Sequence, residues 1–227
     1  MTMIDDFISL FFPRYCLGCS GSLARDEQQV CIHCLTSVPK TKSHEEETNF
    51  VAQKFYGKVD FQHALAYYTF QQDGIVQKLL HQIKYSNQPQ LAFELGERYA
   101  IELSNKFDAI PFDLIIPVPL HFKKRKIRGY NQSEMFADGL ASRWNIPVKG
   151  KVLERKIFTT TQTSKTRIER WKNVESIFTI KDDSVLDQHI LLVDDVITTG
   201  ATIEACANSL IEKGAKTLSV AAIAAAK

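Results

Sequence analysis

The sequence predicts an α/β fold with a mainly parallel sheet, preceded by a small cysteine-rich subdomain. From residue 62 onward, apolar strand-like runs alternate with segments of helical periodicity, which is the pattern of a parallel sheet flanked by helices. Before residue 59, four of the five cysteines lie close together, followed by the polar segment 40–49. We therefore divide the chain into an N-terminal subdomain, residues 1–58, and an α/β domain, residues 59–227.

Size and charge set limits on function. The chain has 227 residues, 44% of them hydrophobic and 24% charged, and a chain of this length can bury roughly 70% of its unfolded surface. Its net charge of +2 is too small for overall attraction to nucleic acids, although a local basic cluster can still bind them.

The N-terminal segment is expected to form an amphipathic helix that packs on its own domain. Asp5 and Asp6 stand where a signal peptide would carry positive charge, and Pro13 ends a short apolar stretch, which argues against export. No run approaches the ~20 apolar residues of a membrane span. We expect a cytoplasmic protein with reduced thiols.

Strands are expected where apolar runs are continuous, as in buried parallel strands. They fall at residues 63–70, 112–119, 189–195 and 217–225. Helices are expected where apolar residues recur every three to four positions, at 74–86, from Pro89 to about Lys106, at 131–144 and at 202–214. Pro89 suits a first helical position, Asn131 with Glu134 resembles a capping box, and Gly214 suits a helix end.

Four cysteines form two closely spaced pairs, Cys16 with Cys19 and Cys31 with Cys34. Two CxxC pairs can supply the four thiolates of a tetrahedral zinc site. Such a site leaves no open coordination position, so we expect the zinc to be structural and necessary for folding of this small segment. Disulfides and a redox pair are the alternatives, and His33 could replace a cysteine as ligand. Cys206 is expected to be a buried apolar residue.

Two adjacent acids, Asp194 and Asp195, end an apolar strand in the segment ILLVDDVITTGAT, residues 190–202. Ligands of parallel α/β sheets bind at the C-terminal ends of the strands. The turn that follows opens a helix, and its backbone N–H groups favour a phosphate; it contains Thr198, Thr199, Gly200, Ala201 and Thr202. The acids suit hydroxyl groups or a divalent cation, so together the segment predicts a sugar-phosphate site.

Two other phosphate-related motifs do not match. A P-loop requires a lysine that this segment lacks. A phospho-receiver domain has a phospho-acceptor aspartate after its acid pair, whereas none of the residues after Asp195 is aspartate. The segment instead resembles the 5-phosphoribosyl-1-pyrophosphate (PRPP) motif of type I phosphoribosyltransferases. That resemblance implies that Asp194 and Asp195 face the ribose hydroxyls and that residues 198–202 bind the 5′-phosphate.

A basic segment follows the strand that ends near residue 119. It contains Lys123, Lys124, Arg125, Lys126 and Arg128. It is either a solvated surface loop or a second anion site, for which pyrophosphate bridged by Mg²⁺ is the natural ligand, since arginine bonds two phosphate oxygens at once.

A further polar stretch, residues 155–178, has no core pattern before Val174. It is either a flexible arm or a lid that excludes water from a bound ligand. The lid candidates are Gln162, Arg167, Arg170 and Asn173.

Taken together, these segments resemble the ComF family, whose best-known members act in DNA uptake during competence. The resemblance covers FFPRYCLGC with the second CxxC, IKY at 83–85, PVPL followed by RKIRGYNQ, the TQT…ERWKNV segment and the PRPP motif. Asn87 stands where the family often has glycine. The resemblance implies a pyrophosphate loop at Pro117, Val118, Pro119 and Leu120.

Two functions remain open. The first is a phosphoribosyltransferase that binds PRPP and Mg²⁺, with Asp194, Asp195, Arg125 and Arg128 as catalytic residues and an unknown acceptor. The second is a non-catalytic module that binds incoming single-stranded DNA, with a competence helicase as partner. The candidate DNA contacts are Lys123, Lys124, Lys126, Tyr130, Asn131 and Gln132, since cationic and aromatic side chains bind single strands.

Overall fold

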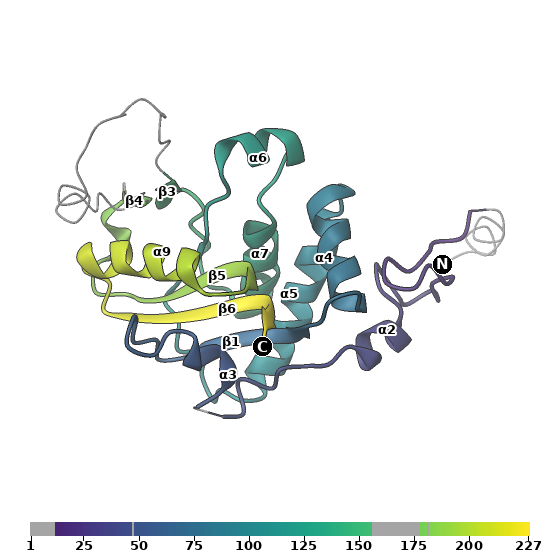
Figure 1. Ribbon diagram of the computed structural model, residues 1–227, viewed down its shortest axis with the longest axis horizontal. Coiled ribbons are helices and arrows are strands. Elements are labelled where there is room, and N and C mark those ends of the chain that lie inside the picture. The colour runs from purple at the N-terminus through teal and green to yellow at the C-terminus, as the bar shows by residue number, and fades with distance from the viewer. Residues whose placement is uncertain (1–11, 47, 156–177, 181) are drawn as a thin grey trace.

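The computed structural model describes residues 12–46, 48–155, 178–180 and 182–227. Four parallel strands form its central sheet in the order β1-β6-β5-β2 (Figure 1). They are β1 (Ala64–Phe70), β2 (Leu114–Pro117), β5 (His189–Ile197) and β6 (Thr217–Ala226). All four are rich in apolar residues because both faces of the sheet are covered.

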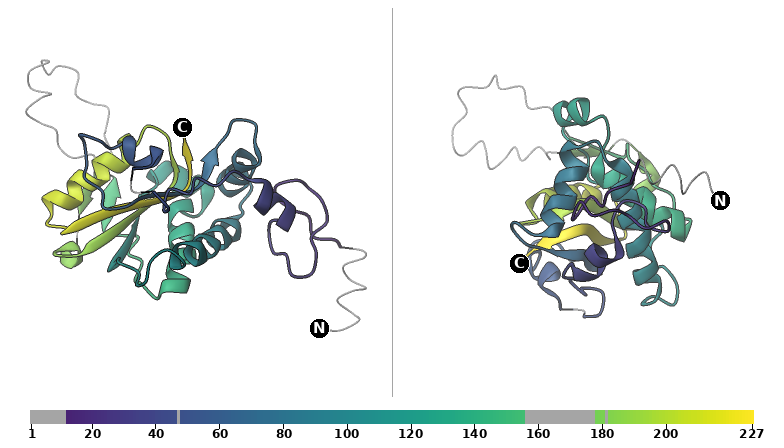
Figure 2. Two further views of the ribbon diagram at one scale, coloured as in Figure 1. Left: turned by 90° about the horizontal axis from the view of Figure 1, so that it is seen from below. Right: turned by 90° about the vertical axis from the view of Figure 1, so that its right-hand side faces the viewer.

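Helices cover both faces of this sheet (Figure 2). Three pack on one face: α4 (Ile75–Tyr85), α5 (Pro89–Ser104) and α7 (Gln132–Trp144). The other face is covered by α9 (Ala201–Glu212), by α3 (Phe50–Gln53) and by a hairpin of β3 (Leu153–Arg155) and β4 (Phe178–Ile180). Alternate side chains of each strand point to the two faces, so each face buries its own cluster of apolar residues.

Helices α5 and α7 approach each other closely at two glycines. A Cβ atom on Gly139 would lie 2.1 Å from the carbonyl oxygen of Phe93, and one on Gly96 would lie 2.3 Å from that of Phe136. Only glycine fits at such a contact. The close crossing fixes α7, whose N-terminus lies at the edge of the sheet where β2 and β5 end.

The N-terminal segment runs past β1, an edge strand of the sheet, and extends beyond α4 (Figure 1). Its short helix α2 (Ile32–Ser37) begins at the cap residue Cys31. The chain then adds a short antiparallel bridge to β1, between Lys40 and Tyr68. Further on, Val51 and Phe55 are buried in the core of the sheet. The predicted boundary at residue 58 stays a prediction.

The predicted α/β fold with a parallel sheet is confirmed, and the expected strands and main helices are present. The segment predicted as a basic loop is instead a helix, α6 (Phe122–Arg128), with His121 as its N-cap and Gly129 as its C-cap. The sequence also gave no indication of the β3–β4 hairpin or of the short 3-10 turn at Asp183–Val185. The expected N-terminal helix, in residues 1–11, lies outside the described residues.

Candidate functional site

The two acids lie at the C-terminal edge of the sheet, where β5 and β2 end side by side. Pro117 of β2 pairs with Val193 of β5, so the segment 117–120 runs next to Asp194 and Asp195. The N-terminus of α7 faces the same edge, because Asn131 caps that helix and its amide also donates to the Val118 carbonyl over 3.0 Å. The acids, the PVPL segment and α7 therefore surround one point.

The two carboxylates are held by different partners. Oδ1 of Asp194 accepts hydrogen bonds from the hydroxyl of Ser133 over 3.0 Å and from the N–H of Asp195 over 2.8 Å. Oδ2 of Asp195 lies 2.9 Å from the ammonium nitrogen of Lys84 on α4. Each acid thus has its own partner, which limits the repulsion between two adjacent negative charges.

The environment of the pair changes the pKa of Asp194. Burial among protein atoms, and next the charge of Asp195, raise the pKa of Asp194 to about 7, although hydrogen bonds from Asp195 and Ser133 act in the opposite direction. A carboxyl group with such a pKa titrates near neutral pH. Perturbed acids in a cleft are typical of functional sites.

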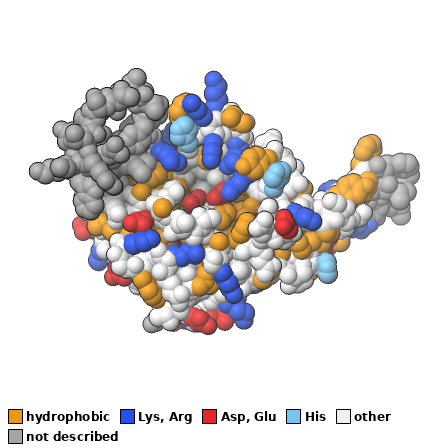
Figure 3. Space-filling model, in the orientation of Figure 1, with side chains coloured by type: hydrophobic (Ala, Val, Ile, Leu, Met, Phe, Trp, Pro, Cys, Tyr) orange, Lys and Arg blue, Asp and Glu red, His pale blue; other side chains and the backbone are white. Residues whose placement is uncertain are grey.

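These acids line a cleft of about 400 Å³. Figure 3 shows acidic side chains in a hollow of this face, with lysine and arginine side chains beside it. The other lining residues are Lys84, Tyr85, Val118, Pro119, Leu120, His121, Lys124, Arg128, Gln132, Ser133, Arg155 and Thr202. The cleft thus joins an acidic floor to a cationic wall.

A smaller cavity of about 40 Å³ adjoins the acids, lined by residues 196–203 together with Asp194. Gly200 is the N-cap of α9, and its φ of +82° is favourable for glycine. Because glycine has no side chain, the N-cap residue itself makes no side-chain hydrogen bond to the first N–H groups of this 12-residue helix. One of them, the N–H of Ala201, donates a long hydrogen bond of 3.4 Å to the Thr199 hydroxyl. Backbone N–H groups at a helix N-terminus suit an anion such as phosphate.

The predicted basic residues separate into two groups. Lys124 and Arg128 line the cleft. Arg125 does not line it; its side chain is half exposed and lies 3.7 Å from Glu134. Lys123 and Lys126 are exposed on α6.

The side chains of the next three predicted residues, Tyr130, Asn131 and Gln132, form hydrogen bonds within the protein. The Tyr130 hydroxyl bonds to the Ile83 carbonyl, and Gln132 accepts from Arg128. Asn131 is only 3% exposed and its amide is used inside the protein. Asn131 therefore presents almost no surface to a DNA strand, and its assignment as a DNA contact stays a prediction. The predicted lid residues Gln162, Arg167, Arg170 and Asn173 lie outside the described residues.

Five lining residues of the cleft were missed by sequence reasoning: Lys84, Tyr85, His121, Ser133 and Arg155. Lys84 belongs to the IKY segment, which carries no charge pattern of its own. Ser133 looks like an ordinary residue of the first helical turn. Arg155 is the first residue of the polar stretch 155–178 and was interpreted only as part of it.

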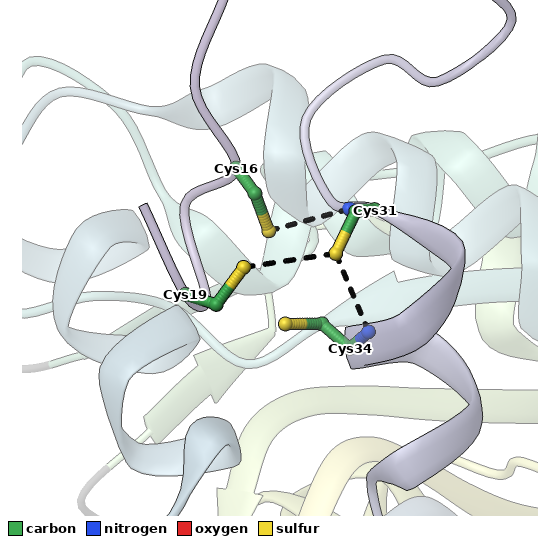
Figure 4. A group of neighbouring side chains, drawn as sticks. All are labelled: Cys16, Cys19, Cys31 and Cys34. Atoms are coloured by element: carbon green, nitrogen blue, oxygen red, sulfur yellow. Dashed lines mark hydrogen bonds between the residues drawn. The ribbon is translucent and has the colours of Figure 1, made fainter. Parts of the chain in front are cut away.

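The four cysteines meet at a second location, in the N-terminal segment (Figure 4). Their sulfur atoms all lie within 4.8 Å of one another, and Sγ of Cys19 is 3.7 Å from Sγ of Cys31. A zinc ion bound to thiolates at ≈ 2.3 Å places two sulfurs about 3.8 Å apart. The arrangement therefore fits a tetrahedral four-thiolate metal site.

Backbone N–H groups already point at these sulfurs. Those of Gly18 and Cys31 each lie 3.3 Å from Sγ of Cys16. Burial alone would raise the pKa of Cys16, but these and other backbone hydrogen bonds lower it to about 7. Burial and the neighbouring cysteines raise the pKa of Cys34, so a metal ion bound here would have to displace its proton. His33 is not in the cluster of metal-ligating side chains found among the described residues.

Comparison with known proteins agrees with this geometry. Residues 131–227 match the family model described as a phosphoribosyl transferase domain. The chain is 32% identical over 146 residues to DNA utilization protein YhgH of Escherichia coli O157:H7, covering 63% of each protein. It is 33% identical to competence protein F of Haemophilus influenzae, covering 50% of this chain and 51% of that protein. It is 31% identical to competence protein ComFC of Bacillus subtilis, covering 53% and 49%.

These matches span about half to two thirds of the relatives' length, and the resemblance to the ComF family is confirmed. Among the described residues, no helix is both long and apolar enough to cross a bilayer. Strands β5 and β6, the acid pair and the anion cavity at the start of α9 all lie in the matched segment. The chain therefore has the type I phosphoribosyltransferase fold, with a phosphoribosyl transferase domain at residues 131–227, and is a relative of competence proteins F and ComFC.

Proposed function

We propose that this protein binds PRPP with Mg²⁺ in the cleft and transfers its phosphoribosyl group to an acceptor. One observation carries the proposal: the anion cavity at the start of α9 adjoins the acid pair, with Asp194 lining both the cavity and the cleft. A ligand with a phosphate next to neighbouring hydroxyls fits this juxtaposition. The opposite wall, with Lys124 and Arg128, suits a second anionic group.

In this proposal, residues 198–202 hold the 5′-phosphate and the acids hold the ribose hydroxyls. The segment 117–120 and Arg128 hold pyrophosphate, with Arg125 as a further predicted contributor. The carboxylates, together with phosphate oxygens of the ligand, would provide the oxygen ligands that suit Mg²⁺, which would neutralise pyrophosphate charge.

The proposed reaction is substitution at the anomeric carbon of the ribose. The bond to pyrophosphate breaks, and the sugar becomes oxocarbenium-like. Arg128 stabilises the departing negative charge, while the acids favour the positive charge on the sugar. The predicted lid residues, between 162 and 173, then exclude water, which would otherwise hydrolyse PRPP. The identity of the acceptor is not part of the proposal.

The test is release of pyrophosphate from PRPP and Mg²⁺, measured across a set of candidate acceptors: nucleobases, primary amines, ammonia and single-stranded DNA. The proposal expects release that depends on one acceptor and is lost in the double variant Asp194→Asn with Asp195→Asn. The matched control is Asp187→Asn, an exposed acid whose positive φ of +56° suits asparagine. Release that is equal in the double variant would refute the transfer reaction.

We also propose that the four cysteines bind one structural zinc ion. The mutual distances of the sulfurs and their backbone hydrogen bonds support this. A site of four thiolates requires reduced cysteines, and all four are free thiols here. This supports the proposed cytoplasmic location.

A second function, binding of single-stranded DNA during competence, is favoured by the surface of α6. None of its residues is buried, and Ile127 is 87% exposed. Nearby, Tyr85 is 71% exposed, and the guanidinium carbon of Arg128 lies 5.8 Å from its ring centroid. Exposed aromatic and cationic side chains together suit a single strand. The names of the relatives, two competence proteins and a DNA utilization protein, agree with such a role. We propose a competence helicase as the partner in this role.

Fluorescence anisotropy with labelled single-stranded DNA tests this function. The double variant Lys123→Ala with Lys126→Ala should bind more weakly and should lower the slope of log affinity against log salt by about one to two. The control changes two exposed lysines outside the cleft, Lys106→Ala with Lys216→Ala. Binding that does not depend on salt, or an equal loss in both pairs, would exclude α6 as a DNA contact.

A further inference from the structure

Lys84 reaches the acid pair from outside the matched domain. It stands in the last turn of α4, and its ammonium nitrogen lies 2.9 Å from Oδ2 of Asp195. Its side chain is 27% exposed, whereas that of Asp195 is 9% exposed. A largely buried carboxylate needs a charged or hydrogen-bonding partner to stay ionised and in place.

The backbone around Lys84 is fixed independently of this ion pair. The Lys84 carbonyl accepts a hydrogen bond from Nε of Arg128 over 2.8 Å, and the neighbouring Ile83 carbonyl accepts one from the Tyr130 hydroxyl. Beneath them, Ile83 is fully buried against the sheet. The segment that forms the cationic wall of the cleft thus also holds the end of α4, and Lys84 reaches Asp195 from an anchored position.

The partners of the two acids show why Lys84 matters. Asp194 is held by groups of the matched domain, Ser133 and the N–H of Asp195. Among the described residues, Asp195 has one ion-pair partner, Lys84. Without that ammonium, the Asp195 carboxylate would face Asp194 with its charge uncompensated and would turn or take up a proton.

We infer that Lys84 is a positioning residue of the sugar site: it holds Asp195 in the orientation that accepts hydrogen bonds from the ribose hydroxyls. This inference rests on the proposed function. It assigns a role to α4, which precedes the phosphoribosyl transferase segment. It also predicts a particular defect, because loss of Lys84 should weaken recognition of the sugar hydroxyls and not recognition of pyrophosphate.

Calorimetric titrations with three probes test it: ribose 5-phosphate, 2-deoxyribose 5-phosphate, and pyrophosphate with Mg²⁺. The variant Lys84→Met should bind ribose 5-phosphate about tenfold more weakly, as expected when a largely buried carboxylate loses its ion-pair partner. Because the lost interaction is the ion pair that orients Asp195, the variant should also lose most of the wild-type preference for ribose over deoxyribose, while pyrophosphate binding stays within about twofold. Lys84→Arg should restore part of the preference. The control is Lys78→Met, an exposed lysine on the same helix.

Each other outcome has a defined meaning. Equal weakening of ribose 5-phosphate and pyrophosphate would make Lys84 a direct anion ligand and overturn the inference. An unchanged preference in Lys84→Met also overturns it. If Lys84→Met does not fold, Lys84→Gln, which keeps a donor without the charge, is measured against the same criteria. Wild-type protein that binds neither ribose 5-phosphate nor PRPP would refute the proposed function itself, and this inference with it.

Discussion

The hydroxyl group of Ser133, in the first turn of α7, donates a hydrogen bond to Oδ1 of Asp194 over 3.0 Å. This bond ties the start of the matched domain to the end of β5. Ser133 is itself 1% exposed, so water cannot easily replace it as the donor.

Ser133→Ala should therefore weaken binding of Mg²⁺-PRPP about tenfold, because a hydrogen bond to a charged group contributes roughly 1.5–3 kcal/mol. Calorimetry measures the loss. Ser142→Ala on the same helix is the control, since the Ser142 hydroxyl bonds only to the Gly139 carbonyl in the described structure. An effect of equal size in both variants would assign the loss to α7 as a whole.

The raised pKa of Asp194 predicts how stability depends on pH. The folded-state pKa of about 7 lies above the ordinary value of 3.8, so the folded state favours the protonated carboxyl. Its contribution to stability is fully present below pH ~4 and is lost as pH rises towards about 7.

Urea unfolding of the wild type and of Asp194→Asn between pH 4 and pH 8 checks this dependence. The variant has no titrating group at this position, and its Oδ1 can still accept from Ser133. The free energy of unfolding of the wild type should therefore fall relative to that of the variant as pH rises. Parallel pH curves for the two proteins would show that the Asp194 pKa is not raised.

The anion cavity predicts a specific defect at Gly200. Its φ is +82°, and a Cβ atom there would lie 2.6 Å from Cε1 of Phe55. Gly200→Ala should lower stability through both effects, by more than about 1 kcal/mol, and should displace the phosphate-binding turn.

Gly57→Ala is the matched control for this substitution. Gly57 also has a positive φ, of +74°, but a Cβ atom there meets nothing within 4 Å. It should show a cost of about 1 kcal/mol and unchanged affinity for ribose 5-phosphate. Thermal unfolding and calorimetry measure both quantities; an equal effect on ligand affinity at the two positions would argue against a phosphate site beside Gly200.

The cysteine cluster predicts about one zinc ion per chain by elemental analysis. Cys16→Ser should lose the metal and destabilise the N-terminal subdomain, because a small metal site contributes much of the folding free energy of its segment. Cys206→Ala is the control, since Cys206 lies on α9, is buried in the apolar core against the sheet and is outside the cluster. Retention of zinc by Cys16→Ser would show that Cys16 is not a ligand.

The strands were predictable because burial on both faces leaves continuous apolar runs, as in residues 190–193. The acid pair and residues 198–202 were predictable because they are contiguous and carry a local pattern. Helix α6 was not, because none of its residues is buried and its sequence therefore has no apolar face. Its position is set by its capping residues, His121 and Gly129, which a charge count does not reveal.

The partners of the acids could not be predicted, because tertiary structure alone brings them together. Lys84 and Asp195 lie on different elements with most of the α/β domain between them in sequence. Ser133 reaches Asp194 only because the close contact at Gly96 and Gly139 fixes α7 against α5. By contrast, the cysteine spacing did predict the cluster. The two cysteines of each pair are close in sequence, so the fold only had to bring the two pairs together.

The central claim is that the acid pair and the turn at residues 198–202 form a PRPP site. Calorimetric titration of the wild type with PRPP and Mg²⁺ tests it most directly, compared with Asp194→Asn combined with Asp195→Asn and with the control Asp187→Asn. We expect saturable binding of one PRPP per chain, unchanged in the control and at least about 100-fold weaker in the double variant. Absence of binding by the folded wild type, or equal binding by the double variant, would contradict it.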